Sequence, residues 1–205
     1  MTTQHEENRA ERPLLQTVTL YTEVSSRRAK ELVGGTMESS SEAISNLTRW
    51  ISEIVLQDTQ PEELKALGIS RSQPIFATPV PFQGATPMKG KVLLTFETNP
   101  SHVYVAEGDH LTAMRQVGII DMGLYSKLRQ AIGKSTEVTF NEFLPHYQSL
   151  PRQDKDNIVA GIAPLAHNYW TSVVPYSEYI KFPQPYTEPE TLLLPQAPIV
   201  SLRKI

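Results

Sequence analysis

The sequence predicts an α+β fold for a single domain, and three observations support this interpretation. Segments with the alternating pattern of β-strands occur near both ends and in the middle of the chain, and segments with helical periodicity lie between them. Of the 205 residues, 40% are hydrophobic, which provides enough apolar side chains for one packed core. No repeat with a period of about 20–50 residues is visible, which argues against solenoids and propellers.

Polar and charged residues dominate the start of the chain. Residues 1–13 show no capping pattern and no apolar run, so we expect a flexible leader there and one domain over residues 14–205. A cleavable signal would need an apolar run of about 7–15 residues, and a membrane span about 20. We find neither pattern and therefore expect a soluble protein, either cytoplasmic or delivered into a target cell by a route independent of a signal peptide.

The first predicted element is a strand over residues 16–21, where apolar residues alternate with polar ones. A short helix is expected next, because Ser25 and Ser26 are suitable N-caps and apolar residues then recur at helical spacing. The Gly34-Gly35 pair supplies the residues that commonly end a helix.

The clearest helical pattern covers residues 40–56. Ser39 and Glu42 form a candidate capping box at its start, and apolar residues follow along one face. This apolar stripe consists of Ile44, Leu47, Ile51, Ile54 and Val55. A second, short helix is expected over residues 61–67, because a proline suits its first turn and Gly68 its end.

The middle of the chain predicts β-structure. Residues 74–80, 91–98 and 102–108 are rich in β-branched and aromatic side chains, and a Pro/Gly-rich loop and an Asn-Pro turn separate them. We expect these three segments to be sequential strands of one sheet.

Helical patterns return over residues 124–132, 140–147 and 154–170, and Pro164 is expected to kink or end the last of them. Short strands are expected to complete the chain at residues 179–182, 191–194 and 199–202. Six prolines lie between residues 175 and 198, which suits edge strands and turns better than central strands.

Composition excludes several classes of function. Lysine and arginine total 19 against 22 aspartate and glutamate residues, and this balance argues against binding to duplex DNA. The absence of cysteine excludes disulfides, thiolate metal sites and cysteine nucleophiles. Phosphate-loop, dinucleotide-fold and zinc-protease motifs are missing, and the five histidines show no metal-ligand spacing, so the sequence predicts no metal site.

Two local motifs are candidates for ligand binding. Residues 25–28, Ser-Ser-Arg-Arg, can hold an anion at a helix N-terminus, or can simply cap the helix with solvated arginines. Glu188 and Glu190 are spaced to project from the same face of a strand, about 7 Å apart. One of these glutamates can then hold a sugar hydroxyl while the other meets a second substrate; the alternative is a solvated acidic turn.

Four segments together resemble a known family in their order along the chain. Residues 20–37 read LYTEVSSRRAKELVGGTM, and residues 75–79 read IFATP, with QGA downstream. Residues 92–109 read VLLTFETNPSHVYVAEGD, and residues 188–195 read EPETLLLP. In this order they resemble the cholera-toxin-like branch of the ADP-ribosyltransferase fold, with its Arg, Ser-Thr-Ser and Glu-x-Glu motifs.

The resemblance implies two small facing sheets with peripheral helices and NAD in the cleft between them. It implies a toxin or effector that transfers ADP-ribose from NAD to a macromolecule, expected to be a protein, without a metal. Glu190 would hold the nicotinamide ribose, and Glu188 would approach the acceptor. Thr78 would hydrogen-bond the glutamate or the ribose, and Tyr21 or Phe82 would stack on the nicotinamide.

Two positions depart from the family pattern. Thr22 stands where the family has an arginine that contacts NAD, and Ala77 stands where it has the first serine of Ser-Thr-Ser. We count Thr22 with the candidate NAD contacts and expect Arg27 or Arg28 to replace the missing arginine. The departures keep a catalytically inactive binding domain on the same fold as an alternative. A third hypothesis is an interaction domain whose proline-rich C-terminal segment docks a partner; an immunity or inhibitor protein would be a further partner of a toxin.

Overall fold

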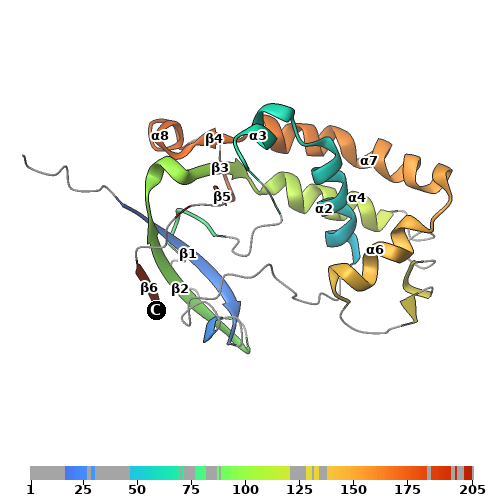
Figure 1. Ribbon diagram of the computed structural model, residues 1–205, viewed down its shortest axis with the longest axis horizontal. Coiled ribbons are helices and arrows are strands. Elements are labelled where there is room, and N and C mark those ends of the chain that lie inside the picture. Colours follow the sequence, from blue (N-terminus) through green and yellow to red (C-terminus); the bar gives the residue numbers. More distant parts are fainter. Residues whose placement is uncertain are drawn as a thin grey trace, which may run out of the picture.

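The structure combines two small antiparallel sheets with a group of helices, which confirms the predicted α+β class. Figure 1 shows the sheets at one end of the molecule and most of the helices at the other. This computed structural model describes residues 17–26, 29–30, 47–69, 71, 77–81, 87, 89–120, 128–130, 132–133, 138–183, 186–194, 197 and 201–204. No helix in this described part of the chain is long and apolar enough to cross a membrane.

The first sheet has the strand order β1-β2-β6. Strand β1 covers Val18–Ser25, β2 covers Lys91–Thr98 and β6 covers Ser201–Lys204. β1 and β2 pair antiparallel along their whole length. The observed strand therefore extends beyond the predicted residues 16–21 and ends at Ser25. Of the strand predicted at residues 199–202, residues 201 and 202 form the start of β6, and residues 199 and 200 lie outside the described part.

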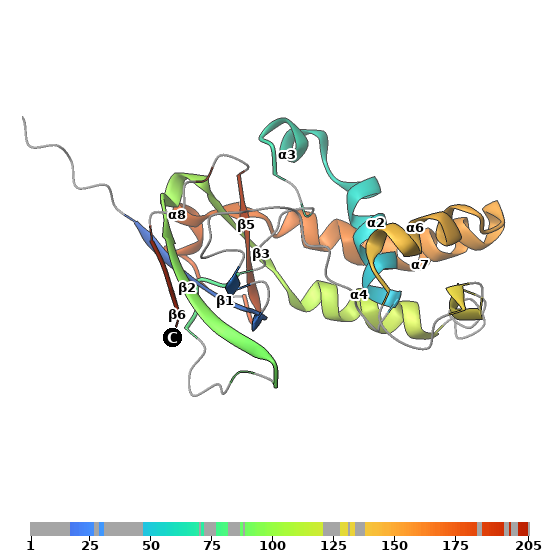
Figure 2. The ribbon, with the colours of Figure 1, turned by 60° about the horizontal axis from the view of Figure 1, so that its bottom comes forward.

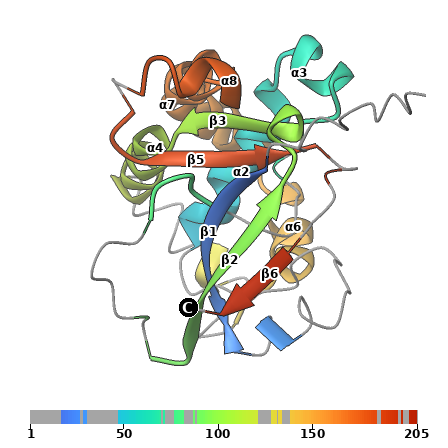
Figure 3. The same cartoon turned by 90° about the vertical axis from the view of Figure 1, so that its left-hand side faces the viewer.

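The second sheet has the strand order β4-β3-β5. Strand β3 covers Val103–Glu107, β4 covers Val174–Pro175 and β5 covers Pro189–Leu193. β3 and β5 lie crosswise to β1 and β2 (Figure 3). Side chains from both sheets meet in one small apolar core, whose buried members include Val18, Leu20, Leu94, Phe96, Val103 and Leu193.

The expectation that residues 74–80, 91–98 and 102–108 form sequential strands of one sheet is wrong, because β2 and β3 belong to different sheets. A short 3-10 helix, η1 at Pro100–His102, separates the two strands. The Asn99 side chain caps η1 by accepting a hydrogen bond from the backbone N–H of Ser101. This capped turn redirects the chain, so the strand after it pairs with β4 and β5 instead of β2.

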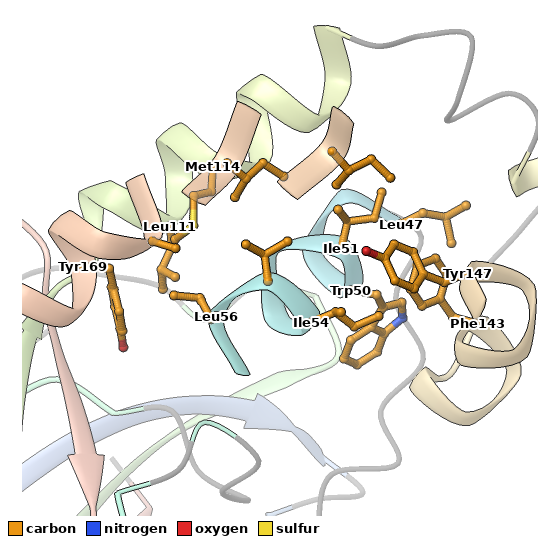
Figure 4. Packing of buried hydrophobic residues seen from close by; sticks show 14 of the residues in the cluster. Leu47, Trp50, Ile51, Ile54, Leu56, Leu111, Met114, Phe143, Tyr147 and Tyr169 are labelled. Atoms are coloured by element: carbon orange, nitrogen blue, oxygen red, sulfur yellow. The ribbon is translucent and has the colours of Figure 1, made fainter. Parts of the chain in front are cut away.

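Most of the helices pack around a larger apolar core. Their bounds are Leu47–Thr59 for α2, Glu62–Ala66 for α3, Asp109–Ile120 for α4, Phe140–Gln148 for α6, Arg152–Thr171 for α7 and Tyr176–Tyr179 for α8. Leu56, Met114 and Phe143 are among the fully buried members of this core (Figure 4). Ile162 of α7 is another. The indole N–H of Trp170 donates to the carbonyl of Leu56, which ties α7 to α2.

Four helices correspond to predicted ones, and one of them is α7, which covers the predicted residues 154–170. α2 and α3 match the predictions for residues 40–56 and 61–67, although residues 40–46 lie outside the described part. α6 matches residues 140–147 and begins with a capping box. Only parts of two further predicted helices are described: Ala29 and Lys30 from the first, and residues 128–130 and 132 from the second, are helical.

The later part of the chain differs from the sequence-based expectations at three points. Pro164 does not end α7, which continues to Thr171. The predicted strand over residues 179–182 is the end of α8 and the turn after it, because Pro175 occupies the N-cap of α8. Helix α4 was not predicted at all, although it begins with an aspartate in its first turn, as helices often do.

Candidate functional site

A pocket of about 240 Å³, open to solvent, lies where β1, β5 and the start of α4 meet. It is lined by Tyr21, Ala77, Thr78, Gly108, Leu111, Thr112, Arg115, Glu188, Pro189 and Glu190. These residues come from four separate segments of the chain. Figure 2 shows how α4 leaves β3 and runs toward the helical end of the molecule.

The structure brings four of the sequence-predicted site residues together around this pocket: Tyr21, Thr78, Glu188 and Glu190. The contact between two of them is a β-bridge, in which the backbone N–H of Tyr21 donates to the carbonyl of Thr78 at 2.9 Å and the reverse bond is 2.8 Å long. The next residue back, Ala77, accepts a hydrogen bond from the N–H of Thr191 at 2.7 Å. The 77–78 segment therefore joins β1 to β5 and fixes the pocket wall.

Of the other predicted site residues, the structure describes only Thr22, and it places Thr22 away from the pocket. Thr22 is 2% exposed and is not among the residues that line the pocket, because neighbouring residues of a strand face opposite sides. Arg27, Arg28 and Phe82 lie outside the described residues. Ala77, which stands at the first serine of the resembled motif, does line the pocket, but it contributes no hydroxyl.

Glu190 is held by two buried donors. The Nη1 atom of Arg71 lies 2.6 Å from Glu190 Oε2, and the hydroxyl of Tyr169 donates to the same oxygen at 2.8 Å. The Glu190 side chain is only 13% exposed. Both contacts end on Oε2, which leaves Oε1 without a donor among the described residues of the network. The carboxylate is thus anchored by one oxygen at the pocket wall.

Arg71 is in turn fixed from behind by Glu53. Its Nε and Nη2 atoms donate to the two carboxylate oxygens of Glu53 at 2.7 and 2.9 Å, and its Nη1 contacts the Tyr169 hydroxyl. The guanidinium also lies 5.0 Å from the centre of the Tyr169 ring. Burial lowers the pKa of Arg71, but the charges of Glu190 and Glu53 outweigh burial and raise that pKa well above its ordinary value. Arg71 is therefore a permanently charged link between α2 and β5.

The hydroxyl of Tyr169 is positioned by the helical core. Tyr169 is fully buried in α7, and Figure 4 shows it at the edge of the apolar cluster with its hydroxyl directed away from the other side chains. Burial raises its pKa well above the ordinary value, an effect that Arg71 opposes and Glu190 reinforces. The phenol therefore keeps its proton at neutral pH and donates a hydrogen bond to Glu190.

The backbone that carries Glu188 is fixed by a second carboxylate, Glu107 at the end of β3. Its Oε1 accepts from the N–H groups of Glu188 and Asp109, at 2.9 and 3.1 Å, and its Oε2 accepts from the N–H of Thr187 at 2.6 Å. The N–H of Gly108 donates to the carbonyl of Glu188 at 2.8 Å. The start of α4 and the Glu-x-Glu segment are thereby locked together, while the Glu188 side chain stays exposed.

Arg115 supplies a cation to the pocket from α4. Its Nε atom is buried and has no hydrogen-bond partner in the described part of the chain. Burial, followed by the charge of Arg49, lowers the pKa of its guanidinium. The missing family arginine was expected at Arg27 or Arg28; among the described residues, Arg115 is the arginine that lines the pocket.

Sequence reasoning missed five residues of the site: Glu53, Arg71, Glu107, Arg115 and Tyr169. Two of them carried a usable signal. Glu53 interrupts an otherwise apolar helix face and is 6% exposed, and a buried charge of this kind requires a partner. Arg115 shares helical spacing with Leu111, but this signal depends on α4, which was not predicted.

The site can bind a ligand that is cationic at one end and anionic at the other, because two glutamates and one arginine face the same pocket. No group of three or more metal-ligating side chains occurs among the described residues. No protein-family model, curated protein or solved structure matches this chain.

Proposed function

We propose that this protein is an NAD-dependent mono-ADP-ribosyltransferase of the toxin or effector type, which transfers ADP-ribose from NAD to a protein acceptor. One observation carries the proposal: Tyr21, Thr78 and Glu190 line one pocket, although more than a hundred residues separate the last from the other two. They stand in the order in which the resembled family places its NAD-site motifs.

The surroundings of Glu190 support a role in bond cleavage. When the bond between C1′ of the ribose and the nicotinamide nitrogen breaks, its electron pair leaves with nicotinamide and positive charge develops on the ribose. A carboxylate fixed in advance stabilises that charge without reorganising during the reaction. Arg71 and Tyr169 hold Glu190 by Oε2, and Oε1 is available to the ribose.

Glu188 is suited to the second half of the reaction. Its side chain is exposed at the pocket mouth, while its backbone is bound to Glu107 and Gly108. An acceptor N–H or O–H that attacks C1′ must lose its proton, and a mobile carboxylate beside it can take that proton. Glu188 would therefore act on the acceptor, while Glu190 would act on NAD.

A binding domain on the same fold that lacks catalysis is the second candidate, and one contact favours it. The 2.6 Å ion pair with Arg71 neutralises part of the charge on Glu190 that the reaction needs. Thr22 and Ala77 also favour the binding domain, because neither residue supplies the arginine or serine that the resembled family has at that position.

Measuring nicotinamide release from NAD by the purified full chain tests the proposal against this alternative. The transferase should release nicotinamide and should bind ADP-ribose. Binding of NAD with no release of nicotinamide, even when lysate proteins are added as acceptors, would favour the binding domain. Absence of both binding and release would reject both candidates.

A further inference from the structure

Helix α4 turns one face toward the pocket. Gly108, directly before the helix, and Leu111, Thr112 and Arg115 within it all line the pocket. Their spacing of three, four and seven residues from the glycine is that of a single helical face. At 1.5 Å per residue, Arg115 lies about 10 Å beyond Gly108 along the helix axis. The helix thus presents a cation on the side of the pocket away from the helix start.

Arg71 and Arg115 both lie near the pocket, but they differ in whether their N–H donors have acceptors. Arg71 donates to two carboxylates and contacts a phenol, and its side chain is 1% exposed. Arg115 is half-buried and its Nε has no acceptor among the described residues. A buried donor without a partner costs free energy, so a ligand that supplies an acceptor here is stabilising. Arg115 therefore keeps a cationic donor, Nε, from which no described residue accepts a hydrogen bond.

The charged groups around Arg115 favour the binding of an anion beside it. Arg49 and Arg71 act on it as like charges, while Glu53 and Glu190 act on it as opposite charges. Both carboxylates are already engaged by Arg71. A planar guanidinium on a helix face is well suited to phosphate, because its donors match two oxygens at once.

The size of the pocket limits what it encloses. Its volume of about 240 Å³ is below the roughly 300–1,000 Å³ typical of sites that enclose a drug-sized ligand. Only part of a dinucleotide fits inside, and the rest must pass along the surface. A phosphate at Arg115 would leave the carboxylates of Glu188 and Glu190 to the ribose portion.

We propose that Arg115 is the residue that binds phosphate in this pocket, and that the ligand is held there through a phosphoanhydride group. That this group is the pyrophosphate of NAD rests on the proposed function; the assignment of an anion to this place rests on the unpartnered Nε of Arg115 and on the position of Arg115 at the pocket. From the sequence, Arg27 or Arg28 was expected to replace the arginine that contacts NAD, and we assign that contact to Arg115 instead.

The test is calorimetric titration of the full chain and of Arg115→Gln with ADP-ribose, inorganic pyrophosphate and adenosine. Wild-type protein should bind the first two, and the affinity for both should fall roughly 10–100-fold in the variant, as for a lost charge-assisted hydrogen bond. Adenosine has no phosphate and should not distinguish the two proteins. ADP-ribose affinity within about twofold of the wild-type value would overturn the inference.

Arg152→Gln is the matched control, because Arg152 is 92% exposed at the start of α7, about 25 Å along that helix from Tyr169. Its affinities should equal those of the wild type. Thr112→Glu provides a second variant at an exposed position, in case Arg115→Gln fails to fold. It places a carboxylate three residues from Arg115 and should weaken pyrophosphate binding more than Thr112→Gln, which adds a side chain of the same size without the charge. Equal binding by both Thr112 variants would contradict the inference.

The outcomes separate this inference from the proposed function. Pyrophosphate binding that depends on Arg115, with no binding or cleavage of NAD, supports the phosphate site and rejects the transferase. Cleavage of NAD with an ADP-ribose affinity unchanged in Arg115→Gln supports the transferase and rejects the phosphate site. Wild-type protein that binds neither pyrophosphate nor ADP-ribose overturns the phosphate site.

Discussion

Arg71 joins the helical part of the molecule to the pocket through a single buried guanidinium. It forms ion pairs with Glu53 on α2 and with Glu190 on β5, and it is thus the cation that compensates for the burial of both side chains. The arrangement also fixes the position of Glu190 at the pocket. Arg71 acts through Glu190 and is a positioning residue in this account.

Replacing Arg71 by methionine should destabilise the fold strongly. The variant leaves two carboxylates buried without a cation, and breaking a buried ion pair in this way typically costs about 3–5 kcal/mol. Urea denaturation measures the loss, with Arg152→Met as the exposed control. The double variant Glu53→Gln/Arg71→Met should recover part of it, because one orphaned charge is removed. A loss below about 1 kcal/mol would mean that the pair is not buried as described.

Tyr169 should make the stability of the protein depend on pH in the alkaline range. Its pKa in the folded state is raised well above the ordinary value of about 10, so the unfolded chain releases its phenol proton first as pH rises. The stabilisation is therefore complete below about pH 10 and is lost as pH rises toward the folded pKa. Burial is the main cause, and Arg71, Glu53 and Glu190 are the charges that face the phenol.

Urea denaturation of the wild type and of Tyr169→Phe at about pH 9 and about pH 11 checks this expectation. The variant loses the hydrogen bond to Glu190 at every pH, but it lacks the titration and should lose less stability between the two pH values. An equal loss in both proteins would show that the Tyr169 phenol is not held protonated by the fold.

Glu190 was identified from the sequence because a Glu-x-Glu pair is a local pattern. Arg71 was not, because its partner Glu190 is 119 residues away along the chain and the two meet only in the folded protein. An isolated arginine in a polar stretch carries no pattern that distinguishes it from a solvated one. Residues that position a catalytic group are therefore harder to predict than the group itself.

At the scale of elements, the turn from β3 into α4 fixes the Glu-x-Glu segment. A Cβ atom on Gly108 would lie 2.5 Å from the carbonyl oxygen of Glu188, closer than such atoms approach in proteins. The glycine is required here because the backbone of another segment approaches it closely. The same contact carries the 2.8 Å hydrogen bond from Gly108 to Glu188.

We therefore expect Gly108→Ala to have a large effect on the rate of nicotinamide release and a much smaller effect on the free energy of unfolding. The clash pushes the Glu188–Glu190 segment away from α4 and misplaces the carboxylates, and even a small misplacement of a reacting group can cost about 10²-fold in rate. Gly161→Ala, at an exposed position inside α7, is the control and should stabilise the helix by up to about 1 kcal/mol with unchanged activity. Full activity in Gly108→Ala would show that the segment is not held by this contact.

Prediction of helices and strands succeeded where the signal lay within one segment, and it failed where contacts with other segments determine the structure. α6 has a capping box in its own sequence and was predicted within a few residues. Ile180 and Phe182 suggested a strand by their composition, but they follow a proline-capped helix and are 57% and 71% exposed. β2 and β3 were placed in one sheet because nothing in their own sequences states which neighbour each will pair with.

At the scale of the whole molecule, the site lies at the junction of two cores. The smaller core fills the space between the sheets, and the larger one lies among the helices. Their common boundary contains β5, which contributes Leu193 to the first core, Leu192 to the second and Glu190 to the pocket. The α+β class and the order of the motifs were visible in the sequence. The junction was not, because it depends on how the two cores meet.

The central claim is that Glu190 acts on NAD and Glu188 acts on the acceptor, and one side-by-side assay tests it most directly. Glu190→Gln and Glu188→Gln are compared with the wild type for nicotinamide release and for labelling of lysate proteins from biotin-labelled NAD. Glu178→Gln, an exposed glutamate on α8, is the control. Its two activities should equal those of the wild type.

Glu190→Gln should lower both activities by roughly 10²–10³-fold, because it removes a preorganised charge from the ribose site. Glu188→Gln should keep most of the nicotinamide release and lose the labelling, because its partner is the second substrate. Small and equal effects from both substitutions, with nicotinamide release intact, would contradict the account and leave Glu188–Glu190 as a solvated acidic turn.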